Sequence, residues 1–174
     1  MILDCIGKAI FLFFIYNIVS LLIFGVPKSL SATFYLYKER LDVLKVLFPA
    51  TIGMLVICLM PCWLHISHGS NFQFLSFLSA MSLAFVGASP SFNESLEGVV
   101  HKVSAYLCAL CAILWIILVT PFWYVILIVL VAIIAAALLT KTWKTCYVYW
   151  LEMVAFLSTF TTIVLYYLTF VKVI

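Results

Sequence analysis

The 174-residue chain has the composition of a protein embedded in lipid. Hydrophobic residues make up 68% of it and charged residues only 9%, which excludes a soluble globular fold because so much apolar surface could not be buried. The net charge of +3 is small and dispersed, and no basic run is interleaved with aromatic residues, so nucleic acid is excluded as a main partner. The six cysteines lie mostly in apolar runs, which indicates packing rather than a disulfide framework.

Six apolar segments follow one another along the chain. A helix needs roughly 20 apolar residues to cross a hydrocarbon core of about 30 Å. Pro121 divides the fourth segment from the fifth, since a continuous helix of about 40 residues would overshoot the bilayer. The sequence therefore predicts an all-α, integral membrane six-helix bundle with short loops, a single membrane domain over residues 1–174. Its expected spans are about 9–25, 46–65, 72–88, 99–119, 122–140 and 147–170.

The most charged segment, residues 26–45, separates the first two spans. We expect a loop there, with room for a helix that lies in the membrane interface. Two interpretations of its hydroxyl groups stay open. They bind a ligand or a lipid headgroup, or they cap a short amphipathic turn at the membrane surface. The residues concerned are Ser29, Ser31, Thr33 and Tyr35.

The third segment carries a small residue at every fourth position, from Ser76 through Ala80 and Ala84 to Ala88. Residues four apart share one face of a helix, so this stripe forms a shallow groove that another helix can approach closely. The pattern predicts a packing surface. It also leaves open an oligomer formed through helix–helix contact.

A polar stripe opens the fourth span. If a helix begins near Asn93, residues spaced by three and four lie on one face, namely Glu94, Glu97, His101, Ser104, Cys108 and Cys111. The stripe thus leads from the membrane surface into an apolar span. Cys108 and Cys111 form a CxxC motif, but inside a span and without a neighbouring strand they indicate packing rather than redox chemistry.

The basic residues predict the orientation of the chain. With six crossings, both termini lie on one side together with Lys8 and Lys172, and the other side holds seven basic residues. Because basic residues in short loops favour the cytoplasm, we expect a multi-pass protein of the cell membrane with both termini outside, in a bacterial inner membrane. Asn93 then begins an N-glycosylation sequence that stays cytoplasmic and unmodified.

Glu97, His101 and Glu152 form the strongest candidate cluster. Glu97 and His101 are four residues apart on one helix face, and Glu152 enters from the same side in the last span. A carboxylate inside a membrane is costly, so it usually faces the bundle interior or a wet cavity. One interpretation is a pocket that holds a proton, a cation or a polar headgroup, with His101 exchanging a proton near neutral pH. The alternative is a structural clasp between the fourth and sixth spans.

Cofactors are not expected. Cys62, His65 and His68 recur every three residues and carry metal-binding groups, but three candidates at one helix end without a fourth make only a weak metal site. A haem clamped between helices needs two axial ligands at similar depth, whereas His65 and His101 belong to opposite ends of the bundle.

No GxSxG, HExxH, Walker or GxGxxG motif is present, so no known catalytic signature supports an enzyme. The hydroxyl-bearing SLSATFY and the SLEGVVHKVSAYLCA stretch, within a six-span layout, resemble small uncharacterised bacterial membrane proteins and, more remotely, the damage-regulated autophagy modulator type. The resemblance implies no established activity. It implies Ser31, Glu97 and His101 as pocket residues, and the chain lacks the extracellular loop elaboration of the eukaryotic type.

The sequence thus favours a membrane protein that binds or transports a small solute, a proton or a lipid headgroup through a polar pocket at the cytoplasmic side. The expected partners are the lipid bilayer and this small polar ligand. Two alternatives are a structural or regulatory membrane subunit without its own ligand, and a lipid-modifying intramembrane enzyme with His101 as base. The candidate pocket residues are Glu97, His101, Glu152, Ser31, Tyr35 and Ser104.

Overall fold

The computed structural model describes residues 2–40, 42–91 and 94–171, and the regular structure in these ranges is helical. Short 3₁₀ turns occupy Asp42–Val46 and Ser89–Ser91, and a π-helical turn, Tyr167–Val171, follows the last helix. The all-α prediction is therefore confirmed for the described part of the chain. Its seven α-helices are α1 Ile2–Phe24, α2 Ala32–Arg40, α3 Leu47–Ile66, α4 Gln73–Ala88, α5 Glu94–Val119, α6 Tyr124–Leu139 and α7 Tyr147–Tyr166.

The described helices make the chain a multi-pass membrane protein. Four of them are long and apolar enough to cross a membrane, by length and composition, over Ile2–Phe24, Asp42–Ile66, Gly98–Val119 and Tyr147–Phe170. The helices α4 and α6 are also apolar but have only 16 residues each, or about 24 Å of length against a hydrocarbon core of about 30 Å. Crossing by these two helices stays a prediction.

One segment differs from the sequence-based expectation, and another takes a form that the expectation allowed. The helix α1 begins at Ile2 rather than near residue 9, because Asp4 and Lys8, four residues apart, form an ion pair of 2.7 Å on its surface that favours the helical conformation. The charged segment between the first two spans contains a helix, α2, followed by the 3₁₀ turn Asp42–Val46.

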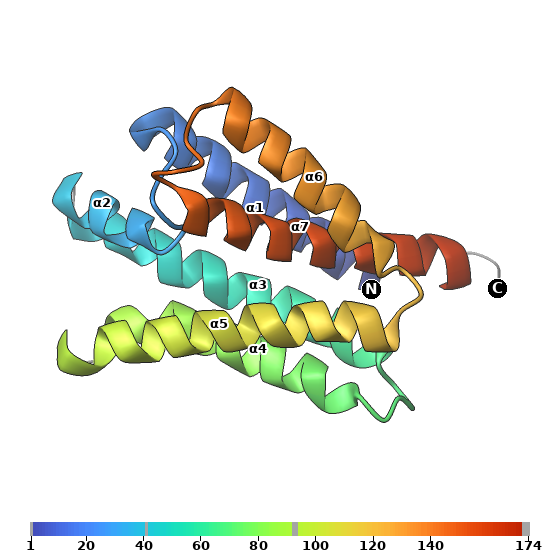
Figure 1. The fold of residues 1–174 in the computed structure, drawn as a ribbon. Helices are drawn as coiled ribbons and strands as arrows, with labels where there is room; N and C mark the ends of the chain where they lie inside the picture. Colours follow the sequence, from blue (N-terminus) through green and yellow to red (C-terminus); the bar gives the residue numbers. More distant parts are fainter. Residues whose placement is uncertain (1, 41, 92–93, 172–174) are drawn as a thin grey trace.

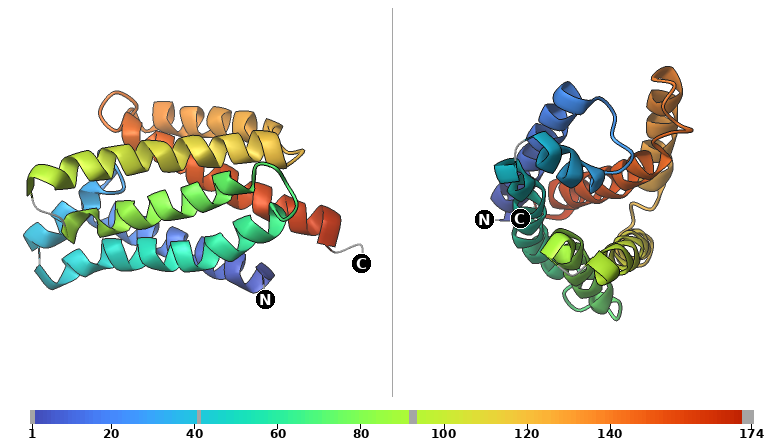
Figure 2. Two further views of the ribbon diagram at one scale, coloured as in Figure 1. Left: turned by 90° about the horizontal axis from the view of Figure 1, so that it is seen from below. Right: turned by 90° about the vertical axis from the view of Figure 1, so that its left-hand side faces the viewer.

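Consecutive apolar helices run in opposite directions, and both termini lie at the same end of the molecule (Figure 1). The other end holds α2, the Ser89–Ser91 turn and the turn between α6 and α7 (Figures 1 and 2). We call it the basic end, since its loops and helix ends carry Lys28, Lys38, Arg40, Lys45, Lys102, Lys141 and Lys144. Within the molecule α4 packs against both α3 and α5, α1 packs against α3, and α6 packs against α7.

The packing of α4 on α3 depends on Gly87. A Cβ atom built at this position would lie 2.9 Å from Cγ2 of Ile52 and 3.1 Å from its Cβ. Ile52 is β-branched and therefore restricted in χ1 within a helix, so its side chain has little freedom to turn away. Of the predicted small-residue stripe, Ser76 and Ala80 are fully buried whereas Ala88 is exposed, so only part of the stripe is a packing surface.

Replacing Gly87 with alanine should therefore destabilise the protein by about 1–3 kcal/mol, the usual cost of overpacking a core. The measurement is the free energy of unfolding in detergent micelles, obtained by titration with a denaturing detergent. Gly53→Ala is the matched control, because a Cβ at Gly53, also in a helix, would meet nothing within 4 Å. Equal stabilities of the two variants would contradict a close approach of the helices at Gly87.

Candidate functional site

A pocket of about 200 Å³ lies at the basic end, between α2, the beginning of α3 and the first turns of α5. Three of the residues predicted from the sequence, Ser31, Tyr35 and His101, share this pocket. Its lining residues carry hydroxyl, imidazole and ammonium groups and three aromatic rings. Its lining residues are Ser31, Phe34, Tyr35, Phe48, Ser89, Pro90, Gly98, His101 and Lys102.

The loop between α1 and α2 positions Ser31. Gly25 ends α1 with a φ of 71°, a left-handed conformation that favours glycine. Ser29 caps α2, since its Oγ accepts a hydrogen bond of 3.1 Å from the backbone N–H of Ala32, and it also bonds the Ser31 hydroxyl at 2.9 Å. The buried Thr33 hydroxyl donates to the Leu30 carbonyl and bonds the Tyr16 hydroxyl. Capping thus applies to Ser29, whereas Ser31 lines the pocket.

Ser89 orients the imidazole of His101. The Ser89 hydroxyl donates to the Val86 carbonyl at 2.8 Å, and its oxygen lies 2.9 Å from Nδ1 of His101. Because the hydroxyl proton is engaged by Val86, the Ser89 oxygen is the acceptor and Nδ1–H of His101 is the donor. Ser89 is only 1% exposed, so this bond is sheltered from water and holds the ring in a defined orientation.

Glu152 lines an adjoining, smaller cavity of about 60 Å³ between α3, α4, α5 and α7. Its Oε2 accepts a hydrogen bond of 2.7 Å from the backbone N–H of Leu30. Glu152 therefore joins the last helix to the loop before α2. Ser31 and Phe48 line both this cavity and the pocket of His101, so the two spaces are neighbours.

Further hydrogen bonds hold the beginning of α7 against the same loop. The backbone N–H of Tyr149 donates to the Lys28 carbonyl at 3.1 Å, and the Cys146 thiol donates to the Val26 carbonyl at 3.3 Å. The Tyr149 hydroxyl reaches α1, where it donates to Oδ1 of Asn17 at 3.3 Å. These contacts place Glu152 beside Leu30.

Of the predicted cluster, His101 and Glu152 lie in neighbouring spaces. His101 lines the pocket, and Glu152 lines the smaller cavity. Glu97 belongs to α5, but its side chain lies outside the described residues, as does Asn93 of the predicted glycosylation sequence. Ser104 is buried on α5, about one turn beyond His101.

Sequence reasoning missed Ser89, Lys102 and the Leu30 backbone. Lys102 directly follows His101, and adjacent residues on a helix point about 100° apart, so periodicity alone did not group them. Ser89 lies twelve residues before His101, and the donor to Glu152 is a main-chain N–H that any residue except proline would supply. A serine followed by proline at the end of an apolar segment was the only signal for Ser89.

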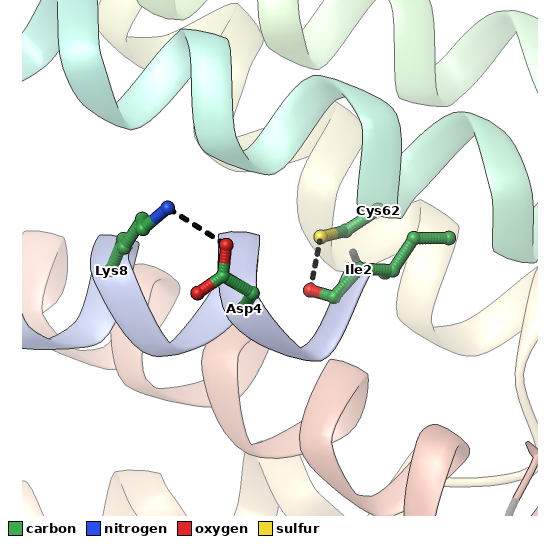
Figure 3. Close-up of polar contacts among 4 residues, drawn as sticks. All are labelled: Ile2, Asp4, Lys8 and Cys62. Carbon is green, nitrogen blue, oxygen red and sulfur yellow. Dashed lines mark hydrogen bonds and ion pairs between the residues drawn. The ribbon is translucent and has the colours of Figure 1, made fainter.

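At the opposite end, Cys62, His65 and His68 do not come together as a metal site. Cys62 is buried, and its thiol donates to the carbonyls of Cys58 at 3.3 Å and Ile2 at 3.8 Å; Figure 3 shows the contact with Ile2 beside the Asp4–Lys8 ion pair. Both imidazoles are exposed, and His65 stacks on Tyr167. Among the described residues, no group of three or more His, Cys, Asp and Glu could hold a metal ion.

No protein-family model, curated protein or solved structure matches the chain. The resemblance to small bacterial six-span proteins therefore stays a prediction, and the function has to be inferred from the site itself.

Proposed function

We propose that this membrane protein binds the anionic headgroup of a lipid in the pocket of Ser31, Tyr35 and His101. The observation that carries the proposal is the gathering of an imidazole, an ammonium group and three hydroxyl groups from separate chain segments. Ammonium and imidazolium groups form charge-assisted hydrogen bonds with phosphate, and the hydroxyl groups of Ser31 and Tyr35 add further donors. The third hydroxyl, that of Ser89, already donates to Val86 and orients His101. Such a set of donors suits a phosphate group.

The surroundings of the pocket favour a lipid over a soluble anion. The helix α2 carries exposed Lys38 and Arg40, and the Arg40 guanidinium lies 5.7 Å from the centre of the Phe24 ring. Tyr35 is 48% exposed at the edge of the pocket. Basic and aromatic residues in this combination are typical of the membrane interface, where lipid phosphates lie.

The basic end is proposed to face the cytoplasm, with six crossings and both termini outside. The excess of basic residues at this end supports the orientation. A C-terminal fusion should then give active alkaline phosphatase but no fluorescent protein signal, because the first enzyme matures outside and the fluorophore only in the cytoplasm. The reverse pattern would overturn the orientation, and matched expression levels of the two fusions are the control.

Replacing Lys102 or His101 with alanine should weaken binding of a fluorescent phosphatidate analogue about tenfold or more, since each hydrogen bond to a charged group contributes about 1.5–3 kcal/mol. Binding is measured on the purified protein in neutral detergent micelles. Lys38→Ala is the matched control, because Lys38 belongs to the same end but does not line the pocket. An equal loss in all three variants would show diffuse attraction between charges and would contradict a pocket.

The hydrogen bond from Leu30 to Glu152 favours a second candidate function, that of a structural or regulatory membrane subunit. In that role the hydrogen bonds of the polar residues at the basic end only hold α2 and the loop before it against the other helices. The variants at Lys102 and His101 would then lower the melting temperature in detergent without a selective effect on lipid binding.

A further inference from the structure

Glu152 forms no ion pair with any residue that the structure describes, although it lies beside the pocket of His101. We infer that Glu152 binds a proton when an anionic headgroup enters that pocket, so that the headgroup and the proton bind as a pair. This inference rests on the proposed binding of a lipid headgroup and adds a coupled ion to it.

The distance between the carboxylate and the pocket is short. Oε2 of Glu152 lies 2.7 Å from the backbone nitrogen of Leu30, and the next residue, Ser31, lines the pocket. Covalent geometry limits the path from that nitrogen to the Ser31 hydroxyl to about 8 Å. The carboxylate therefore lies within about 10 Å of a hydroxyl that is proposed to donate to the phosphate.

The walls around Glu152 offer no charge to balance its carboxylate. Its cavity is lined mostly by apolar side chains, and the described walls from α3, α4 and the loop before α2 carry no titratable group. The titratable neighbours are the Cys108 thiol on α5 and the Tyr149 hydroxyl, one turn earlier on α7. Thiol and phenol groups are uncharged at neutral pH, so they do not neutralise an ionised Glu152.

Basic groups line the pocket rather than the cavity. Lys102 and His101 lie there together with Tyr35, and Lys28, in the loop before α2, is exposed. An anion added to the pocket makes the electrostatic potential at Glu152 more negative, whichever of these groups it contacts. A like charge nearby favours the protonated form of a carboxyl group.

The expected size of the coupling follows from the distance. At about 10 Å and an effective dielectric constant of about 20, one added negative charge changes the affinity about tenfold. Protonation of Glu152 removes the repulsion between the two charges, and its bond with Leu30 persists because a protonated carboxyl keeps an acceptor oxygen. Since linkage is reciprocal, the proton favours binding of the headgroup by the same factor.

The test measures binding of a short-chain ether analogue of phosphatidylglycerol to the full chain in neutral detergent, from about pH 6 to about pH 9. The phosphodiester keeps one negative charge throughout, so the ligand itself does not titrate. The affinity of the unmodified protein should fall as the pH rises and Glu152 ionises. In Glu152→Gln, whose amide cannot ionise, the fall should be about tenfold smaller. The two proteins should bind alike at the acidic end of the range.

Two comparisons separate Glu152 from other titrating groups. His101 is present in both proteins, so its titration contributes equally and cancels in the difference. Glu39→Gln is the matched control, because Glu39 is exposed on α2 at the basic end and lines neither the pocket nor the cavity. This variant removes the same charge and should keep the pH dependence of the unmodified protein.

Infrared difference spectra test the unmodified protein directly. Addition of the ether lipid at neutral pH should produce the C=O stretching band of a protonated carboxyl group, and the ether lipid has no ester carbonyl that absorbs in the same region. The band should be absent from Glu152→Gln and present in Glu39→Gln. This measurement does not depend on how well the glutamine variant folds.

The outcomes separate the two proposals. Identical pH dependence in the unmodified protein and Glu152→Gln, or absence of the carboxyl band from the unmodified protein, would overturn the inference about the proton. If Lys102→Ala still weakened binding in that case, the headgroup pocket would stand. Failure of the unmodified protein to bind the ether lipid at any pH would overturn both proposals.

Discussion

Replacement of Trp115 with alanine should lower the free energy of unfolding by about 3–5 kcal/mol, the cost of truncating a large buried aromatic residue. Trp115 is fully buried, at 0% exposure. Its ring meets that of Trp63 edge to face, with centroids 6.4 Å apart, and its Nε1–H donates to the Ser67 hydroxyl at 2.7 Å. Within a bilayer, such packing and hydrogen bonds hold helices together. The measurement is reversible unfolding in detergent micelles.

The hydrogen bond can be separated from the packing by a double-mutant cycle. Ser67→Ala leaves the buried indole N–H without its acceptor, at a cost of about 1–3 kcal/mol. Trp115→Phe removes the donor and keeps most of the ring. The double variant should be more stable than the sum of the two single effects predicts, because it leaves no unpaired indole. Strict additivity would contradict a bond between these two groups.

Glu152→Leu should release the loop before α2 and disrupt the pocket of Ser31, Tyr35 and His101. The substitution leaves the Leu30 N–H without the oxygen that it now meets at 2.7 Å, and an unpaired buried donor costs about 1–3 kcal/mol. Ser31, next in the chain, lines the pocket, so a displaced loop should also weaken binding of a lipid headgroup. Glu152→Gln keeps an acceptor oxygen at the same place and should change both properties much less.

Limited proteolysis with trypsin measures the release of this loop. Lys28 is exposed and lies two residues before Leu30, so cleavage after Lys28 should become several times faster in Glu152→Leu, in proportion to the population of the released loop. Cleavage after Lys144, in the turn before α7, is the internal control. Equal cleavage rates at Lys28 in the leucine and glutamine variants would contradict a role for the carboxylate as the acceptor that holds the loop.

Composition and local pattern were sufficient to predict the helices. Apolar segments separated by polar turns indicate membrane spans, since the bilayer requires every backbone group within it to be paired inside its own helix. Local chemistry also determines the break around Pro121, where α5 ends at Val119 and α6 begins at Tyr124. The early start of α1 was missed because charged residues were taken as outside the span, although Asp4 and Lys8 neutralise each other on its surface.

Residue type alone suggested Ser31, Tyr35 and His101 as polar groups near one membrane surface, because their chain positions lie close to the ends of apolar segments. The orientation of His101 required tertiary structure, since the turn that contains Ser89 must fold back against α5. The partner of Glu152 is a backbone N–H, which leaves no mark in the order of side chains. Sequence therefore determined which groups reach the basic end. The packing of helices distant in the chain decided which of them share a pocket, because such contacts depend on distances in space that local periodicity does not encode.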